Sequence, residues 1–244
     1  MKDLVVDIGN SRVKWAFAEH GRVIGSGRAV THDGLELLFA EWSRLTAPPR
    51  CVRLVNVTHT PVGQAITDWV DATWRATVQA TATPAAGGGI TIAYPDPAQL
   101  GTDRWLAMVG ARVAGDLPAC VIDCGSAITL DVVDREGHHQ GGLILPGLTA
   151  QQAGIAKIAP ALPPVELGPA TPLLTQSTAE ALASGYLHGT ASAIQGLARR
   201  CSVESAEPVT PVLTGGDAPL IARYLDMDAR LRPDLVLEGL AALP

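Results

Sequence analysis

This sequence of 244 residues has no excess of basic residues. The chain has 18 Lys and Arg residues against 24 Asp and Glu residues, which gives a formal net charge of −6 at pH 7. This balance argues against nucleic acid or a membrane surface as the main partner, because both are negatively charged. A small phosphorylated ligand is still allowed, since backbone N–H groups and one or two cations are enough to bind it.

Cysteines and long apolar runs are also scarce. The four cysteines form no C-x-x-C pair and no Cys/His cluster typical of zinc sites. The first residues lack the apolar stretch of a secretory signal, and no run approaches the ~20 apolar residues that a membrane helix needs. Because hydrophobic residues still make up 47% of the chain, we expect a compact cytoplasmic protein with reduced thiols.

Two segments of the chain share one arrangement of acidic residues and glycines. VVDIGNSRVKWAFAEHGRVIG (residues 5–25) and VIDCGSAITLDVVDREGHHQG (residues 121–141) match at an offset of 116 residues with no gap. The duplication predicts two α/β domains, residues 1–115 and 116–244. The matched pairs are Asp7 and Asp123, Gly9 and Gly125, Gly21 and Gly137, and Gly25 and Gly141.

Each copy predicts an antiparallel meander of three strands, because alternating apolar residues follow the first turn. The three glycines at 87–89 follow no predicted strand and are expected to form a flexible loop. Periodicity predicts further strands at 52–57, 77–81 and 211–216, and helices at 34–46, 62–74, 103–115, 147–159, 217–226 and 234–242, with one or two helices over 177–201.

The duplicated turn has the composition of an anion-binding site. A tight turn can direct several N–H groups at one anion, and Gly9 and Gly125 lack the Cβ that would stop a phosphate from approaching. Side-chain donors come from Asn10, Ser11 and Ser126. A single Asp-x-Gly at a strand end is usually only a turn, but two copies in one frame favour a pair of turns that hold a polyphosphate.

Five motifs, in order, give the chain a family resemblance. They are DIGNSRVK (7–14), YPDPAQLGTDRW (94–105), DCGSAITLD (123–131), GGLILPGL (141–148) and STAEALASG (177–185). Over roughly residues 4–217 the chain resembles type III pantothenate kinase, of the acetate and sugar kinase, heat-shock chaperone and actin superfamily. The resemblance implies two duplicated ribonuclease H-like (actin-like ATPase) domains that clasp ATP, each with a mixed sheet and flanking helices.

The resemblance also implies a reaction and its residues. ATP would phosphorylate the primary hydroxyl of pantothenate to 4′-phosphopantothenate, the first step of coenzyme A biosynthesis, with Mg²⁺ and a monovalent cation, K⁺ or NH₄⁺. ATP would be held by Asp7, Ile8, Gly9, Asn10, Ser11, Arg12, Val13, Lys14 and Ser126, pantothenate by Tyr94, Gly101, Thr102, Asp103, Arg104 and Thr178, and the monovalent cation by Asp123. Asp103 would be the catalytic base. Serine replaces the family's usual threonine at 11 and 126.

These residue types suit phosphoryl transfer, which depends mostly on positioning and charge stabilisation. A carboxylate such as Asp103 can orient a hydroxyl and accept its proton. The fork-shaped guanidinium of Arg104 suits the carboxylate of pantothenate. The TGGDA run at 214–218 resembles an adenosine-side loop of the superfamily.

Each assignment has a structural alternative. Asp103 could only stabilise the start of a helix, Arg104 could form a surface ion pair, and Thr178 could only cap a helix. Lys14 could face solvent, and Tyr94 could only pack in its loop. His138 and His139 are expected on the surface, Cys124 is expected to be a structural thiol, and the role of Asp131 is open.

Two other functions are compatible with the same fold. One is a non-catalytic accessory or regulatory protein, and the other is a kinase of another small hydroxylated substrate. The intact acids favour an enzyme, because a binding protein need not retain a base. We also expect a homodimer formed through the apolar helices of 177–201.

Overall fold

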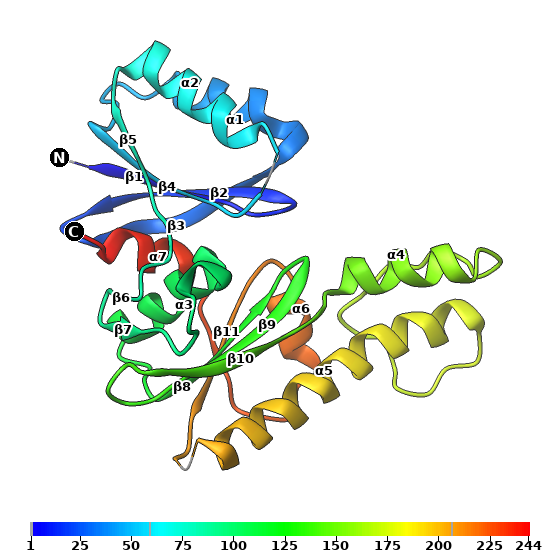
Figure 1. Cartoon of the computed structure of the whole chain (residues 1–244). Coiled ribbons are helices and arrows are strands. Elements are labelled where there is room, and N and C mark those ends of the chain that lie inside the picture. Colours follow the sequence, from blue (N-terminus) through cyan, green and yellow to red (C-terminus); the bar gives the residue numbers. More distant parts are fainter. Residues whose placement is uncertain (1, 59, 206) are drawn as a thin grey trace. The chain divides into compact units, whose positions relative to one another are not determined.

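The computed structural model describes residues 2–58, 60–205 and 207–244, which fold into two compact units (Figure 1). The first unit comprises Met1–Gly115 and Asp234–Pro244, and the second comprises Asp116–Pro233. The predicted division placed 234–244 in the second domain. The structure differs there because the apolar side chains of this last segment are buried against the first unit.

The first unit is built on a five-stranded mixed sheet in the order β3-β2-β1-β4-β5. The first three strands form the predicted antiparallel meander, and β4 and β5 continue the sheet in parallel to β1. The strands are β1 (Asp3–Ile8), β2 (Arg12–Glu19), β3 (Arg22–Thr31), β4 (Cys51–Asn56) and β5 (Thr77–Ala80).

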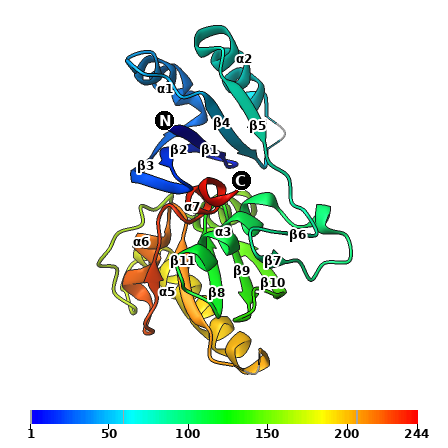
Figure 2. The ribbon, with the colours of Figure 1, turned by 90° about the vertical axis from the view of Figure 1, so that its left-hand side faces the viewer.

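Helices α1 (Leu35–Trp42) and α2 (Val62–Trp74) lie over one face of this sheet (Figure 2). The bounds of α2 are as predicted, whereas α1 begins one residue later than predicted, after a 3₁₀ turn at His32–Gly34, and ends four residues earlier, where the chain turns at Ser43 and Arg44. The core beneath the helices is rich in aromatic rings: Trp15, Phe17, Phe39, Trp42, Trp69 and Trp74. The remaining tryptophan, Trp105, also belongs to the first unit, so all five tryptophans of the chain lie there.

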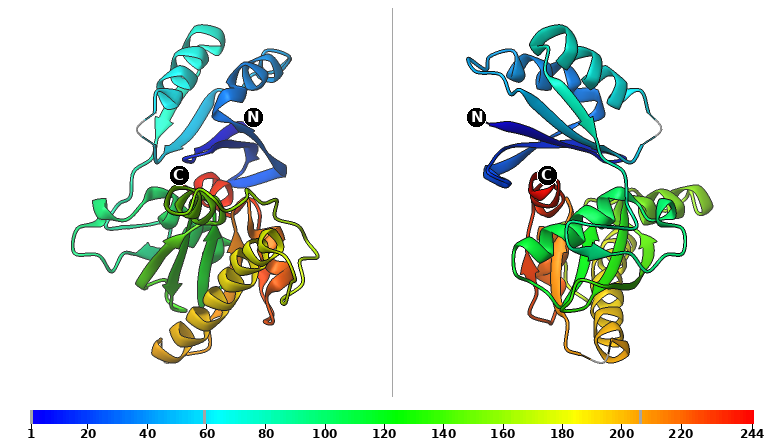
Figure 3. Two further views of the ribbon diagram at one scale, coloured as in Figure 1. Left: turned by 90° about the vertical axis from the view of Figure 1, so that its right-hand side faces the viewer. Right: turned by 60° about the vertical axis from the view of Figure 1, so that its left-hand side comes forward.

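Two further helices, α3 (Thr102–Val113) and α7 (Leu235–Ala242), run side by side, and α7 packs against β1, β2 and β3 (Figure 3). Glycines allow the helices to approach closely. A Cβ at Gly110 would lie 2.2 Å from the carbonyl oxygen of Leu235, and one at Gly239 would lie 2.0 Å from that of Leu106. The C-terminal helix therefore holds α3 in place through backbone contact.

The glycine run at 87–89 is a tight hairpin between β6 (Ala86–Gly87) and β7 (Ile90–Thr91). Gly88 and Gly89 have φ of +59° and +76°, values that favour glycine. Added side chains would collide with the outer face of α3, at 2.6 Å from Val109 and 2.3 Å from Arg112. The expectation of a flexible loop was wrong, because the lack of side chains lets this hairpin pack directly onto a helix.

The second unit repeats the topology of the first, in the order β10-β9-β8-β11-β12. Its strands are β8 (Ala119–Cys124), β9 (Ala127–Val133), β10 (His139–Pro146), β11 (Thr210–Thr214) and β12 (Arg230–Leu231), the last of which the sequence did not predict. The core on one face is formed with α4 (Leu148–Ile158), the single long helix α5 (Thr178–Glu204) and the short α6 (Ala218–Ile221). None of the helices in the described ranges is long and apolar enough to cross a membrane.

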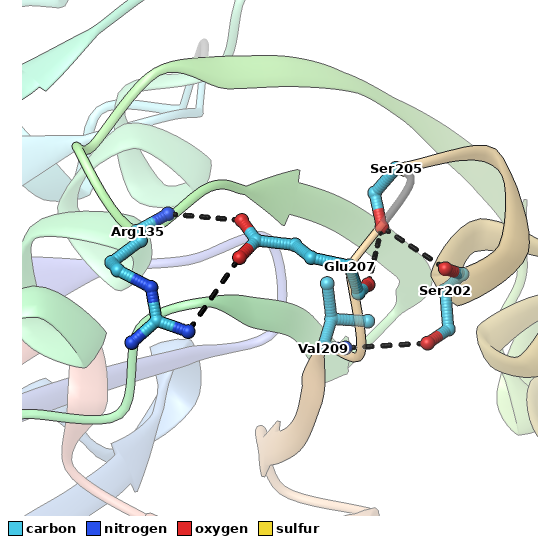
Figure 4. A network of polar contacts seen from close by, with 5 residues as sticks. All are labelled: Arg135, Ser202, Ser205, Glu207 and Val209. Atoms are coloured by element: carbon cyan, nitrogen blue, oxygen red, sulfur yellow. Dashed lines mark hydrogen bonds and ion pairs between the residues drawn. The ribbon is translucent and has the colours of Figure 1, made fainter.

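Polar contacts tie the connections of the second unit together. Glu207, after α5, binds the backbone N–H of Arg135 at 3.2 Å and its guanidinium at 3.7 Å, while the hydroxyl of Ser205 bonds to the carbonyl oxygens of Ser202 and Glu207 (Figure 4). At the start of the unit, the fully buried carboxylate of Asp116 pairs with two arginines of the edge strand region, Arg230 and Arg232.

The repeat holds in three dimensions, but both turns of the meander differ in length between the copies. In the second turn, the paired Glu19 and Arg22 enclose two residues, whereas Val133 and His139 enclose five. Gly21 and Gly137 both have positive φ in the second turn, and Gly25 and Gly141 both have positive φ farther on, so the matched glycines serve the same backbone need. The first turn differs in length. Four residues separate the paired Ile8 and Val13, whereas three separate Cys124 and Ile128, so the ungapped match breaks there.

Candidate active site

The first glycine turn joins β1 to β2 in the first unit. Asp7, 7% exposed, occupies the end of β1, and Asn10, Ser11 and Arg12 are exposed on the turn. Each end of the turn is fixed by hydrogen bonds. Gly9 N donates to Arg12 O at 3.0 Å, and Val57 N donates to Ile8 O at 3.2 Å.

Nothing in the described chain requires residue 9 to be a glycine. Its φ lies outside the left-handed region, and the nearest atom to an added Cβ would be Arg12 O at 3.6 Å, which is an ordinary contact. Glycine at this position is therefore not explained by backbone strain or by packing within the described chain. The expected approach of a ligand to the backbone at this position would account for it and stays a prediction.

Lys14 lies directly opposite Asp7 on the neighbouring strand. Cross-strand neighbours project from the same face of a sheet, so the ammonium and carboxylate share one side of the turn. Lys14 is half-buried rather than fully solvent-facing. The pair places one cation beside the turn that the sequence predicts to bind an anion.

The expected acceptor residues lie at the start of α3. Gly101 precedes the helix, and a Cβ there would lie 2.6 Å from the Asp103 carboxylate, so glycine leaves space for this acid. Asp103 Oδ1 accepts the backbone N–H of Arg104 at 2.8 Å. Thr83 secures the segment, since its hydroxyl lies 2.9 Å from Leu100 O and 3.1 Å from the hydroxyl of Thr102.

Arg104 is buried, with 7% of its surface exposed, so the alternative of a surface ion pair was wrong. Its Nη1 donates to the hydroxyl of Tyr94 at 3.3 Å, and its guanidinium carbon lies 5.9 Å from the centre of that ring. The aromatic ring thus holds a permanently charged fork in a fixed place. Tyr94 does more than pack within its loop.

The second glycine turn, in the second unit, follows Asp123 at the end of β8 and contains Ser126. Two other glycines pack against it. A Cβ at Gly147 would lie 2.2 Å from Gly125 O, and one at Gly215 would lie 2.4 Å from the Asp123 carboxylate and 2.5 Å from Cys124 O. The LPGL and TGGDA motifs therefore include glycines that let their backbone approach the turn.

Cys124 is fully buried beside this turn. Burial, followed by the charges of Asp123 and Asp217, raises the pKa of its thiol well above the ordinary value. A protonated thiol at neutral pH is a poor nucleophile, which agrees with a structural role.

Thr178 begins α5, but the cap of this helix is its neighbour. The side chain of Ser177 accepts the backbone N–H of Glu180 at 3.3 Å and donates to the Glu180 carboxylate at 2.9 Å. The capping explanation for Thr178 was therefore wrong, because Ser177 fills that role.

The two neighbouring histidines differ. His138 is exposed and lies 3.0 Å from the carboxylate of Asp134, whereas His139 is only 3% exposed and pairs with buried Asp131 at 3.0 Å. The expectation of a surface position was wrong for His139, because the next strand starts there and turns it inward. The pair gives Asp131 a structural partner.

The predicted site residues thus fall into two sets, one in each unit. The first unit brings the Asp7–Lys14 turn, Tyr94 and Gly101–Arg104 into one compact body, and the second contains Asp123, Ser126 and Thr178. Sequence reasoning missed the residues that pack against the turns, His32, Gly147 and Gly215. For the two glycines the signal was present in LPGL and TGG, but His32 lies in no recognisable motif.

Comparison with known proteins identifies the family. The model of the type III pantothenate kinase family matches residues 3–200. The chain belongs to this family. Similar relatives include the type III pantothenate kinases of Nitrosococcus oceani, 36% identical over 98% of this chain and 92% of the relative, and of Alkalilimnicola ehrlichii, 37% identical over 98% and 96%.

Solved structures support the fold. A structure described as a conserved putative Baf family transcriptional activator from Campylobacter jejuni covers 97% of this chain and 94% of its own, with a TM-score of 0.56 and 20% identity. The activator of 2-hydroxyisocaproyl-CoA dehydratase from Clostridium difficile, with bound ADPNP, covers 100% and 93%, with a TM-score of 0.56 and 16% identity. The predicted fold of two duplicated actin-like ATPase domains is confirmed.

Proposed function

We propose that this protein transfers the γ-phosphate of ATP to the primary hydroxyl of pantothenate, the first step towards coenzyme A. Family membership supports the reaction, and one observation carries the assignment of its acceptor side. The buried guanidinium of Arg104, held by Tyr94, directly follows the carboxylate of Asp103. This pairs an anchor for a carboxylate with a base for a hydroxyl, the two groups that pantothenate offers.

In this mechanism the protein positions the two substrates, and its charged groups stabilise the charge that develops during phosphoryl transfer. The protein itself does little covalent chemistry. Arg104 binds the pantothenate carboxylate. Asp103 orients the hydroxyl and accepts its proton, an effect of ~10²–10⁴-fold in general-base catalysis. The glycine turns hold the ATP phosphates through N–H groups and the hydroxyls of Ser11 and Ser126, and Lys14 adds positive charge.

Oxygen donors at the second turn suit a hard cation. The carboxylate of Asp123 and the carbonyl oxygen of Cys124 both lie close to the backbone of Gly215, so two oxygen atoms are grouped at this turn. Hard monovalent cations and Mg²⁺ prefer such oxygen ligands. When bound, the cations would neutralise phosphate charge, with Asp123 as the protein ligand of K⁺ or NH₄⁺.

The same proposal includes a cytoplasmic homodimer formed through α5. One face of this helix carries Gly185, Gly189 and Gly196. A Cβ added to any of these glycines would meet no described atom within 4 Å. A groove of about 510 Å³ lies on the helix, bordered by Leu173 and Leu174, which are 64% and 88% exposed. Apolar side chains beside a groove of small residues favour a second copy as occupant. Sedimentation as a monomer at micromolar concentration would contradict this part.

The decisive experiment is ADP release measured with pantothenate, a panel of sugars and acetate as alternative acceptors, with Mg²⁺ and K⁺ present. We expect turnover with pantothenate only, and a strong loss of rate when Na⁺ replaces K⁺. Turnover with a sugar but not with pantothenate would favour the alternative kinase, and nucleotide binding without any turnover would favour the accessory protein.

The Asp103→Asn variant tests the base. We expect turnover to fall at least a hundredfold while ATP binding stays near that of the wild type, because the amide keeps the shape and removes the proton acceptor. Glu136→Gln, an exposed acid on the β9–β10 turn, is the matched control. Equal loss of turnover and binding in Asp103→Asn would indicate misfolding instead.

A further inference from the structure

The carbonyl group of Gly9 is held by a residue outside the glycine turn. His32 follows the last residue of β3, Thr31, which pairs with Arg12 at the start of β2. This places the imidazole beside the turn, with Nε2 2.8 Å from Gly9 O. Since a carbonyl oxygen only accepts, Nε2 carries the proton in this contact.

The second unit has a contact at the equivalent position. Gly147 follows the last residue of β10, Pro146, which pairs with Ala127 at the start of β9. Its N–H donates to Ser126 O at 3.2 Å, and its backbone packs closely on Gly125 O. In both repeats, the first residue after the third strand therefore fixes a carbonyl group of the turn. The first repeat uses a side chain, and the second uses a backbone N–H group.

Fixing this carbonyl also fixes an N–H group. A trans peptide is planar, so the carbonyl of Gly9 and the N–H of Asn10 point in opposite directions. Glycine has wide conformational freedom, and rotation of the Gly9–Asn10 peptide is restrained only by its contacts. A hydrogen bond to Gly9 O keeps the N–H of exposed Asn10 directed away from His32.

We propose that His32 is a positioning residue for ATP, which holds the Gly9–Asn10 peptide so that the N–H of Asn10 faces the nucleotide phosphates. The inference rests on the proposed function only in taking this turn as the phosphate site. His32 touches neither substrate in this arrangement, and its effect passes through the orientation of one peptide.

The test compares His32→Ala, His32→Gln and the exposed neighbour Asp33→Ala. Dissociation constants for Mg-ATP come from calorimetry, KM values for both substrates from steady-state kinetics, and Tm from thermal unfolding. We expect His32→Ala to raise the ATP dissociation constant and KM about tenfold, the effect of one hydrogen bond, with an unchanged KM for pantothenate. His32→Gln should recover most of the loss because its amide N–H can donate, and Asp33→Ala should match the wild type.

Several results would overturn the proposal: unchanged ATP affinity in His32→Ala, no recovery in His32→Gln, or equal loss for both substrates together with a lower Tm. Failure of the proposed function gives a different pattern. Wild-type protein that binds ATP without phosphorylating pantothenate would reject that function and leave the comparison of variants intact. Wild-type protein that binds no ATP would reject both.

Discussion

Replacement of Gly239 by alanine tests whether α7 positions the end of α3 that contains the proposed base, Asp103. The new Cβ would lie 2.0 Å from Leu106 O and 2.8 Å from the carbonyl carbon, where ordinary contact begins at 3.4 Å. Both atoms belong to backbone, so the strain cannot be relieved by a side-chain rotation. The two helices must separate by an ångström or more.

Two effects should follow. Overpacking of this kind costs about 1–3 kcal/mol, which for a chain of this size lowers Tm by roughly 3–10 °C. Leu106 lies one helical turn after Asp103, so the separation also displaces the proposed base, and a misplacement of about 1 Å can cost ~10²-fold in rate. We therefore expect kcat to fall by one to two orders of magnitude at temperatures where the variant is folded.

The assays are differential scanning calorimetry and ADP release well below Tm. Gly154→Ala in α4 is the matched control, because no described atom lies within 4 Å of its new Cβ, and alanine should raise the free energy of unfolding by about 0.5–1 kcal/mol. Wild-type Tm and kcat in Gly239→Ala would refute the close crossing of the two helices. A lower Tm with normal kcat would show that the crossing stabilises the fold without positioning the site.

Three other predictions concern separate features. Gly9→Ala should raise KM for ATP at least tenfold with little change in Tm, if a ligand approaches the backbone there. Gly25→Ala, at φ +76°, should instead lower the free energy of unfolding by about 1 kcal/mol and leave KM unchanged. The reverse pattern would reject the idea that a ligand approaches the backbone of Gly9. Asp116→Ala should cost about 1–3 kcal/mol of unfolding free energy in chemical denaturation, since it removes charge-assisted hydrogen bonds to Arg230 and Arg232, whose side chains are partly exposed, and an unchanged free energy of unfolding would contradict this. The hydrogen bond from Cys120 lowers the pKa of the Cys201 thiol to about 7. Iodoacetamide should therefore modify Cys201 faster as the pH rises from 6 to 8, as followed by mass spectrometry. An unchanged rate of modification in a Cys120→Ala variant would exclude this hydrogen bond as the cause.

Sequence periodicity predicted most elements because each contains a long or strongly alternating pattern. The α2 helix matches its predicted bounds, and the meander of each unit follows from alternation after a turn. The edge strand β12 was missed because two residues are too short to show a period. Tertiary burial determined the placement of α7, which a linear repeat cannot indicate.

At the site, the sequence was informative where chemistry needs a motif and uninformative where support comes from packing. Asp103 and Arg104 could be proposed as site residues because the run GTDRW is specific. The partner of Arg104, the inward turn of His139 and the contact of His32 with Gly9 depend on distances between separate strands and loops. A pattern of residue types contains no information on such distances when the partner belongs to no motif.

The distribution of tryptophan has a practical consequence for spectroscopy. Because all five indoles belong to the body formed by 1–115 and 234–244, their emission senses the surroundings of that body alone. The part from 116 to 233 contributes tyrosine but no tryptophan to the spectrum. If the two halves melt separately, circular dichroism will register both events while red-shifted indole fluorescence registers one, so a melting curve recorded only by emission would overlook half of the chain.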